Sequence, residues 1–237
     1  ICVDIAASTQ KLFEETILYA VECVAHMFAR SGIAVDTLCY SGGTALNCPA
    51  NSRLVAESPF QNIHIPQNCD DSGLSLGAAQ YAYHQVLNQP RKKISKSEFR
   101  CLPYLGLSYN KKSFTDVIEE FKSEISVNDI DDIESAAALA AQDLYENKII
   151  AWFETRSEIG PRALGHRSLL INPAYSENWG RMNNLKKRES WRPFAPAVLA
   201  EDAHLYFESP NFKNLEFMSY APKVKDEYIE KLPSITH

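Results

Sequence analysis

The sequence predicts an α/β protein, and three observations favour this class. Two short apolar stretches, Asp36–Tyr40 and Asn62–Ile65, are typical of buried strands. Each is followed by a turn rich in Gly or Asp and then by a segment with helical spacing of apolar residues. A third apolar run, Lys148–Phe153, lies between further segments of this kind. This order of strands and helices is typical of α/β folds, in which ligands bind at the loops that follow the strands.

The remaining elements follow from apolar periodicity and from the residues that interrupt it. One segment is expected to stay helical although it contains Pro49, and Ser168–Ile171 is predicted to be a fourth strand. Five segments have helical spacing: Ser8–Arg30, Thr44–Glu57, Leu74–Val86, Lys112–Phe121 and Ile133–Tyr145.

A polar segment divides the chain into two predicted modules. Residues 88–100 are basic, contain Pro90 and lack apolar periodicity, which is typical of a linker. We therefore expect a first module at residues 1–87 and a second at residues 101–237.

Composition places the chain among ordinary globular proteins. Its 237 residues are 45% hydrophobic and 23% charged, and no run of about 18 apolar residues predicts a membrane-spanning helix. The six cysteines include no CxxC pair, so we expect reduced thiols in a cytoplasmic protein. The first residue, Ile1, is not Met and no signal-peptide pattern follows it, which suggests a fragment or a processed chain.

Positive charge is concentrated in one part of this acidic chain. The net charge is −6, so the molecule as a whole is not built to coat nucleic acid, and nucleic acid is not an expected partner. The segment between Arg156 and Arg192 nevertheless contains eight Lys and Arg residues against three Glu residues. A local basic cluster of this kind indicates an anion such as a phosphate or a nucleotide.

The loop SGGTALN, which follows the first predicted strand, is a candidate nucleotide loop. Gly42 and Gly43 allow backbone N–H groups to approach a ligand closely, and the following helix N-terminus favours negative charge. If the helix begins at Thr44, Asn47 and Asn51 share one face and both could contact a base or ribose. A tight turn with a polar helix face explains the same residues equally well.

The turn Asp70-Asp71-Ser72-Gly73 precedes the third predicted helix and allows two interpretations. An Asp at a helix entrance commonly caps the first turn, which stabilises a helix by about 1 kcal/mol. The same side chains could instead bind a metal ion or a magnesium nucleotide. Spacing alone favours the cap.

Two cationic motifs fall within the basic segment. In RSEIGPRALGHRS, which follows the KIIAWF strand, three arginines are interleaved with Gly and Pro, and arginine suits bidentate recognition of phosphate or carboxylate. The alternative is a structural loop whose arginines pair with Glu154 and Glu158. In KKRESWRP, Lys186 and Arg188 would lie on one side of an extended segment and could hold one polyanion. A solvated charged surface is the alternative there.

Other common catalytic patterns do not occur. The six histidines are scattered, and no two have the spacing of a helical metal pair. The sequence contains neither a Walker A motif nor a GxSxG elbow.

Several of these segments together resemble the O-carbamoyltransferase family, whose members modify nodulation factors, cephem antibiotics and aminoglycosides such as tobramycin. Each motif alone is modest, but their joint occurrence in order is specific. The matching segments are DIAASTQ, SGGTALNCPAN, DDSGLSLGAA, YLG with SY, RSEIGPRALGHRSLL and KKRESWRPFAPAVL.

The resemblance implies a fold, an activity and a set of ligands. The first module would be the second half of an actin-like ATPase domain (the ASKHA fold), and the second module a YrdC-like α/β domain. In the family, the YrdC-like domain converts carbamoyl phosphate and ATP into carbamoyl adenylate. The other domain passes the carbamoyl group to the hydroxyl of a small-molecule acceptor with a bound metal ion, Fe or Mg. The oligomeric state is left open, a homodimer included.

The resemblance also implies roles for nine residues. Lys186 and Arg188 would hold the phosphates and the carbamoyl group, with Arg162, Arg167 and Ser168 in the loop beside them. The other implied residues are Gly42, Gly43 and Asn47 for the nucleotide and Asp71 for the metal.

Two departures from the family pattern affect these expectations. Thr155 stands where the family has Gly before the Arg of RxExGPRALG, which could alter the backbone of the loop. The family's HxxxH metal pair and its continuation after His237 are not in this sequence, so we expect the isolated chain not to carbamoylate an acceptor. Two alternative functions stay open. One is a carbamoyl enzyme of the threonylcarbamoyl or hydrogenase-maturation type, and the other is a non-catalytic nucleotide- or RNA-binding module.

Overall fold

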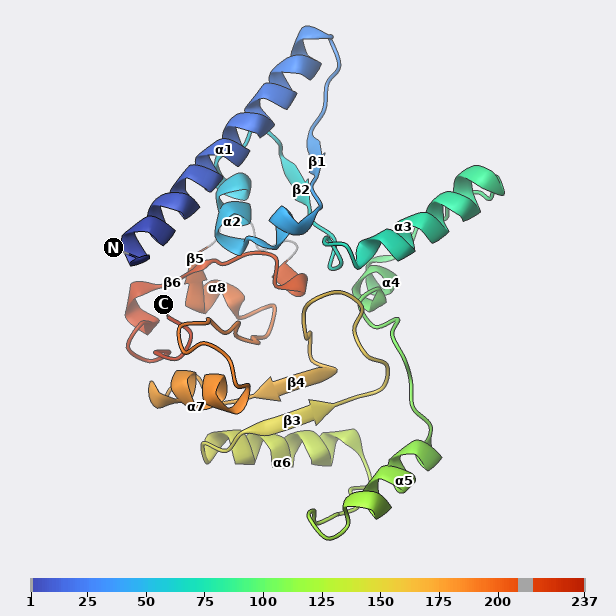
Figure 1. The fold of residues 1–237 in the computed structure, drawn as a ribbon, viewed down its shortest axis with the longest axis vertical. Coiled ribbons are helices and arrows are strands. Elements are labelled where there is room, and N and C mark those ends of the chain that lie inside the picture. Colours follow the sequence, from blue (N-terminus) through green and yellow to red (C-terminus); the bar gives the residue numbers. More distant parts are fainter. Residues whose placement is uncertain (1, 209–214, 237) are drawn as a thin grey trace. The chain divides into compact units, whose positions relative to one another are not determined.

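The computed structural model describes residues 2–208 and 215–236, except for the side chains of Lys96, Ser97, Arg100 and Lys111 (Figure 1). The chain forms two compact units that alternate along the sequence. The first unit contains the described residues up to Arg100 together with Ile159–Arg162 and Leu199–Lys225. The second contains Cys101–Glu158, Ala163–Val198 and the described residues from Asp226 onward. No helix within the described ranges is both long and apolar enough to cross a membrane.

A small parallel sheet forms the centre of the first unit. Strand β1 (Thr37–Cys39) pairs with β2 (Asn62–His64), and Leu38 lies opposite Ile63. The long helix α1 (Cys2–Arg30) and the helix α2 (Cys48–Glu57) pack against each other beside this sheet. The core residues are Val21, Ala45, Leu54, Phe60, Ile63, Ile65 and Cys69. Two parallel strands connected through a helix confirm the α/β class predicted for this region.

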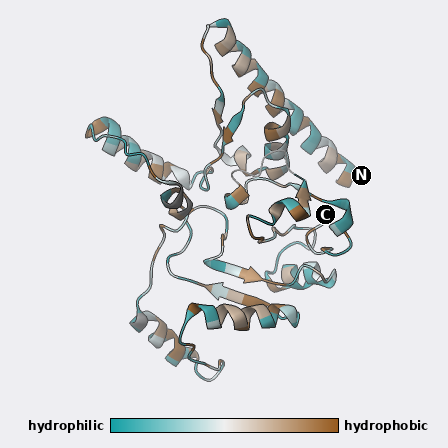
Figure 2. Ribbon diagram, turned by 180° about the vertical axis from the view of Figure 1, so that it is seen from behind, coloured by the Kyte–Doolittle hydropathy of each residue, from teal (hydrophilic) through white to brown (hydrophobic). Residues whose placement is uncertain are grey.

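Helix α1 buries one face and leaves a second apolar stripe exposed. Val21 is its one buried residue among those described, and Ile17, Leu18 and Ala25 pack against the core beside it. Hydrophobic residues nevertheless occur along the whole helix (Figure 2). The exposed stripe consists of Ile5, Leu12, Tyr19 and Met27. The spacing of the first three, seven residues, keeps them on one side of the helix.

The helix predicted at Thr44–Glu57 is two separate elements. A 3₁₀-helix η1 covers Gly43–Leu46, and α2 begins only at Cys48. Pro49 explains the break, because a proline lacks the N–H that a helix interior needs and is tolerated in the first turn. Asn47 therefore lies at the N-cap of α2 and not within a helix.

The rest of the first unit surrounds this sheet. Helix α3 (Gly73–Tyr81) continues into a π-helical turn, η2 (Ala82–Val86), close to the helix predicted at Leu74–Val86. Part of the segment predicted as a linker is helical, because α4 covers Lys96–Cys101. The later elements of this unit are α8 (Ala203–Tyr206), β5 (Phe207–Glu208), η3 (Leu215–Phe217) and β6 (Lys223–Val224), and β5 pairs with β6 in antiparallel fashion.

The second unit is built on an antiparallel strand pair. Strands β3 (Ile150–Phe153) and β4 (Arg167–Leu170) pair over four residues, and α6 (Ile133–Tyr145) packs against β3 (Figure 1). Both strands and α6 agree with the sequence prediction. The unit also contains α5 (Lys111–Phe121), α7 (Glu177–Leu185) and the 3₁₀-helix η4 (Asp226–Tyr228). The two units together give a mixed α/β protein.

Candidate functional site

The Gly42-Gly43 loop of the first unit leaves room for a ligand. Gly42 has φ +104°, a conformation that other residues rarely adopt, and its N–H donates to the Cys69 carbonyl at 2.6 Å. A Cβ added at Gly42 or at Gly43 would meet no atom within 4 Å. Gly43 is also exposed. These features fit the predicted nucleotide loop, because a ligand can reach its backbone.

Asn47 is fully engaged with the protein itself. Its Oδ1 accepts from the Ala50 N–H at 3.1 Å, which caps α2, and also from Gln10 Nε2 at 2.9 Å. Its Nδ2 donates to Gln10 Oε1 at 2.8 Å. In this arrangement Asn47 shapes the loop, and its role in nucleotide binding stays a prediction.

Asn51 does not share a face with Asn47. Its side chain is fully buried, and Nδ2 donates to the carbonyls of Ala45 and Ser219, both at 2.8 Å. These two bonds connect the Gly42-Gly43 loop to the later segment of the same unit. The expectation that both asparagines face a ligand from one helix is therefore wrong, because Pro49 moves the helix start to Cys48.

In the acidic turn, Asp70 performs the local bonding role and Asp71 does not. Asp70 Oδ1 accepts from both the N–H and the Oγ of Ser72. Asp71 is exposed, and its carboxylate has no hydrogen bond or ion pair among the described residues. Neither Asp caps α3, because its N-cap is Ser72 and no side chain in the described part of the chain caps it. The capping interpretation is therefore wrong, and Asp71 is free for a ligand. Within the described ranges no group of three or more His, Cys, Asp or Glu residues could hold a metal ion.

Arg162 is a part-buried cation without an acidic partner. The structure places it in the first unit, where an Nη donates to the Leu46 carbonyl at 3.4 Å and contacts Cys48 Sγ at 3.8 Å. Its Nε is buried and has no partner, and it makes no ion pair within the described part of the chain. Burial raises the pKa of the Cys48 thiol, and the charge of Arg162 acts in the opposite direction. A cation in this state suits an anionic ligand.

Arg167, in the second unit, forms its hydrogen bonds within its own loop. Its guanidinium donates to the carbonyls of Glu154, Thr155 and His166 at 2.6 to 2.9 Å and lies 3.4 Å from the centroid of the Phe153 ring. No carboxylate pairs with it in the described residues. The alternative that the loop arginines pair with Glu154 and Glu158 is therefore wrong for Arg167, which binds backbone carbonyls.

Ser168 and Glu158 complete the same loop from inside. Ser168 Oγ accepts the N–H of Gly165 at 3.0 Å. One oxygen of Glu158 accepts three backbone N–H groups, from Leu164 at 2.7 Å, His166 at 2.9 Å and Arg167 at 3.3 Å. Burial raises the pKa of Glu158, but these bonds outweigh it and the net pKa is lowered. The sequence analysis did not predict that Glu158 orders this loop. The available indication was that Glu158 lies within the RSEIGPRALG motif itself.

Thr155 retains the backbone conformation of a glycine. Its φ is +35°, in the left-handed region that disfavours β-branched residues. Its carbonyl accepts from Arg167, and its Oγ1 lies 3.2 Å from His166 Nδ1. Thr155 therefore occupies a strained position inside a well-bonded loop, as expected if the resemblance is right that Gly usually stands there.

Lys186 and Arg188 follow α7 in a bend, so the segment is not extended, as it would have to be for the alternation to place both on one side. Lys187 between them has φ +49°. Arg188 donates to Asn183 Oδ1 at 2.5 Å and lies 4.4 Å from the centroid of the Phe194 ring. Lys186 has no partner among the described residues, and its pKa is lowered by burial and by the charge of Arg188. The positive charge of Arg188 thus disfavours the charged form of Lys186, and a bound anion would oppose this effect.

The predicted site residues fall into two groups. The first unit holds Gly42, Gly43, Asn47, Asp71 and Arg162, and the second holds Arg167, Ser168, Lys186 and Arg188. Arg162 and Arg167 belong to one sequence motif but to different units, because Ile159–Arg162 contacts the loops of the first.

Two profiles of one protein family match this chain in order. "Carbamoyltransferase N-terminus" matches residues 2–80, and "Carbamoyltransferase C-terminus" matches residues 141–237. The chain belongs to the carbamoyltransferase family. The two matches cover the Gly42-Gly43 loop, the acidic turn and both cationic motifs.

Curated relatives of this chain include nodulation proteins and O-carbamoyltransferases. Nodulation protein NolO of Bradyrhizobium diazoefficiens is 34% identical over 99% of the chain and 41% of its own length. Nodulation protein NolNO of Sinorhizobium fredii is 32% identical over 99% of the chain and 33% of its own length. The 3'-hydroxymethylcephem-O-carbamoyltransferase of Streptomyces clavuligerus is 30% identical over 83% of the chain and 34% of its own length. The chain thus spans about two fifths or less of these relatives.

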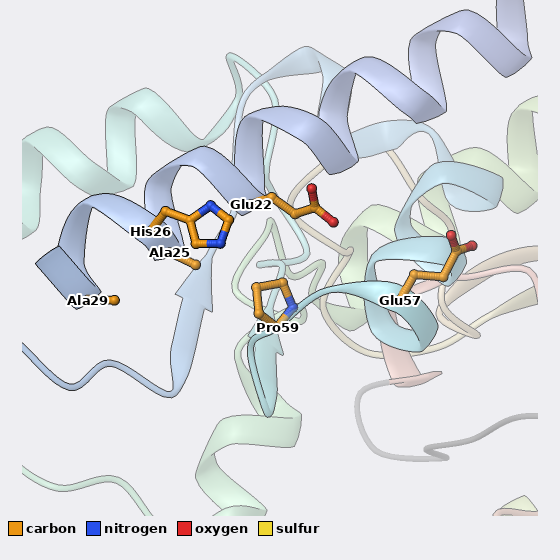
Figure 3. Close-up of a pocket in the computed structure, with 6 residues that line it drawn as sticks. All are labelled: Glu22, Ala25, His26, Ala29, Glu57 and Pro59. Atoms are coloured by element: carbon orange, nitrogen blue, oxygen red, sulfur yellow. The ribbon is translucent and has the colours of Figure 1, made fainter.

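One open cleft of the first unit is lined by none of the predicted site residues. It has a volume of about 440 Å³ and is lined by Glu22, Ala25, His26 and Ala29 of α1 with Glu57 and Pro59 (Figure 3). Glu57 is already paired with Arg53 through two bonds of 2.7 and 2.8 Å. No predicted site residue lines this cleft, so we assign it no role in the family activity.

Proposed function

We propose that this chain is part of an enzyme that forms carbamoyl adenylate and transfers its carbamoyl group to the hydroxyl of a small molecule. The observation that carries the proposal is the ordered match of both family profiles, which together include all nine predicted site residues. The printed name of the cephem relative, an O-carbamoyltransferase, supports a hydroxyl acceptor. In this proposal the residues matched by the N-terminal profile belong to an actin-like domain and the later residues to a YrdC-like domain.

The adenylation step needs positioned charge more than a protein nucleophile. Carbamoyl phosphate, ATP and water would give carbamoyl adenylate, pyrophosphate and phosphate. Negative charge must be neutralised throughout, and preorganised cations are efficient at this. Lys186 and Arg188 support this role in the second unit, because their charges are close and Lys186 has no partner within the described part of the chain. Glu158, Arg167 and Ser168 would keep the neighbouring loop in one shape.

The residues of the first unit fit a nucleotide or carbamoyl anion better than they fit a metal. The open Gly42-Gly43 loop and the unpaired Arg162 could receive an anionic group. Asp71 alone does not make a metal site, and no step of the proposal is routed through a metal ion. If Asp71 is a ligand, the other ligands come from outside this set of described residues. We place the protein in the cytoplasm, which its six free thiols support.

The proposal is tested by pyrophosphate release from ATP in a protein that contains this chain. We expect release to depend on carbamoyl phosphate, and we expect Lys186→Ala to weaken ATP binding about tenfold to a hundredfold, as for a lost charged hydrogen bond. Nucleotide binding without carbamoyl-dependent release would favour the non-catalytic alternative. A steep loss of RNA binding with salt would point to the RNA-binding module instead.

A matched pair of variants tests the metal role of Asp71. Asp70→Asn and Asp71→Asn make the same chemical change at adjacent positions. If Asp71 binds a metal, its Asn variant loses metal and acceptor carbamoylation while its melting temperature is unchanged. Asp70→Asn should retain the metal, because an Asn can still accept from Ser72. Equal metal content in both variants and in the wild type would remove Asp71 from the metal site.

A further inference from the structure

Two buried amide side chains in the first unit have no hydrogen-bond partner. Gln67 and Asn68 follow β2, and they are only 6% and 8% exposed. Neither side chain forms a hydrogen bond with any described residue. Their amide atoms are not fully enclosed, so solvent can reach each amide group and a ligand could bind there in its place.

Two glycines allow neighbouring segments to approach the backbone of this turn. A Cβ added at Gly73 would lie 2.2 Å from the backbone carbonyl oxygen of Asn68. A Cβ added at Gly160 would lie 2.7 Å from the backbone carbonyl oxygen of Gln67. The turn therefore fits between two chain segments that only glycine allows to approach so closely. The backbone that carries both amide side chains is thus fixed before any ligand arrives, which lowers the entropic cost of binding.

A cation and the candidate nucleotide loop belong to the same arrangement. Arg162 follows Gly160 by two residues, and its charge influences the pKa of Cys69, the residue after Asn68. Its Nε is buried without a partner. The Gly42 N–H donates to the Cys69 carbonyl, which joins the Gly42-Gly43 loop to this turn. All of these residues lie in the first unit.

We propose that Gln67 and Asn68 determine specificity by binding the planar carboxamide of a carbamoyl-bearing anion, with Arg162 neutralising its negative group. The inference rests on the proposed function and extends it, because it assigns carbamoyl recognition in the first unit to two residues without an implied role. A carbamoyl group offers two N–H donors and one carbonyl acceptor, and a carboxamide side chain offers the complementary set. A site that hydrogen-bonds such a group rejects analogues that lack it, because its own polar groups then stay unpaired.

The test compares two stable phosphonates that differ only in the amide. Phosphonoacetamide carries a carboxamide, whereas 2-oxopropylphosphonate carries a methyl ketone of the same shape. Calorimetric titration of the 237-residue chain in the Lys186→Ala background removes the competing cation of the second unit. We expect phosphonoacetamide to bind at least about tenfold more tightly, as for one or two lost hydrogen bonds.

Two variants assign the preference to named residues. Gln67→Met and Asn68→Leu should each reduce it to less than about threefold, because neither replacement can accept from the amide N–H groups that only phosphonoacetamide carries. Asn68→Asp keeps the shape of Asn68 and should weaken both probes, because a carboxylate cannot donate to the carbonyl oxygen that both carry and repels their phosphonate. Arg162→Leu should weaken both probes about tenfold or more. Unchanged far-UV circular dichroism and melting temperature establish that each variant is folded.

Two outcomes would overturn the inference, and they differ in what they say about the proposed function. If the parent chain shows no preference, or keeps it in both Gln67→Met and Asn68→Leu, Gln67 and Asn68 do not bind the carboxamide. Carbamoyl-dependent pyrophosphate release would then still support the proposed function. Absence of that release together with no binding of either probe would remove both.

Discussion

Gln10 and Asn47 exchange two side-chain hydrogen bonds of 2.9 and 2.8 Å across 37 residues of sequence. Gln10 lies on α1 and Asn47 caps α2, so the pair fixes the start of α2 against the long helix. Because Asn47 ends the loop that begins at Gly42, the same pair also fixes the far end of the candidate nucleotide loop. Both residues occur in motifs that resemble the family, and the structure gives them one shared task.

A double-mutant cycle should show that Gln10 and Asn47 are coupled. We expect Gln10→Ala and Asn47→Ala each to destabilise the chain and their coupling free energy to be about 0.5–1.5 kcal/mol in urea unfolding. Asn47→Ser is the control, because Ser still caps the helix but cannot pair with Gln10. It should cost less than Asn47→Ala but show the same coupling to Gln10→Ala, because it also removes the amide pair. Strictly additive single effects would contradict the prediction.

Replacing Thr155 should reverse the usual order of Gly and Ala. At most positions Gly is less stable than Ala by about 0.5–1 kcal/mol. The φ of +35° at Thr155 removes that advantage, because a Cβ is strained in the left-handed region by about 1–2 kcal/mol. Thermal unfolding of the two variants, both of which lack the hydroxyl near His166, should show that Thr155→Gly melts above Thr155→Ala. A lower melting temperature for Thr155→Gly would mean that the loop relaxes away from this conformation.

Glu158 should make stability depend on pH in the acid range. Its folded pKa is lowered overall, since three backbone N–H bonds outweigh burial. A depressed carboxyl pKa stabilises the fold above the unfolded value of about 4.3, and this contribution is lost as pH falls through the folded pKa. Melting temperature measured from pH 7 down to pH 3 should therefore fall more steeply in the wild type than in Glu158→Gln. Parallel curves would exclude Glu158 as a source of acid sensitivity.

Replacing Lys186 and replacing Arg188 should affect stability differently but ATP binding alike. Arg188→Ala leaves the buried Asn183 Oδ1 without its donor and should cost about 1–3 kcal/mol of stability. Lys186→Ala removes a charge that burial and Arg188 both disfavour, so the stability should be unchanged or higher. Both variants should weaken ATP binding. Destabilisation by Lys186→Ala with normal ATP affinity would show that Lys186 has a structural role only.

Most elements could be predicted from local sequence, because their signals lie within a few residues. The helix at Ile133–Tyr145 appears with both predicted ends, and Asp132 caps it as its position suggests. The β1 and β2 strands differ from prediction only at their ends. The prediction of one helix at Thr44–Glu57 was wrong for a local reason as well, because Pro49 favours the first turn of a helix over its interior.

The hydrogen-bond partners of the polar side chains could not be predicted from local sequence. Nothing in the local pattern indicates that Arg167 binds three carbonyls, or that Arg162 joins the first unit while its motif continues in the second. The sequence by itself determined the α/β class, the family and the cationic motifs, because periodicity and motif spacing are properties of neighbouring residues. The tertiary structure alone decided which polar atoms lack a hydrogen-bond partner in the described residues, such as the amides of Gln67 and Asn68 and the Nε of Arg162. Hydrogen bonds between segments distant in the chain satisfy some polar groups and leave others for a ligand.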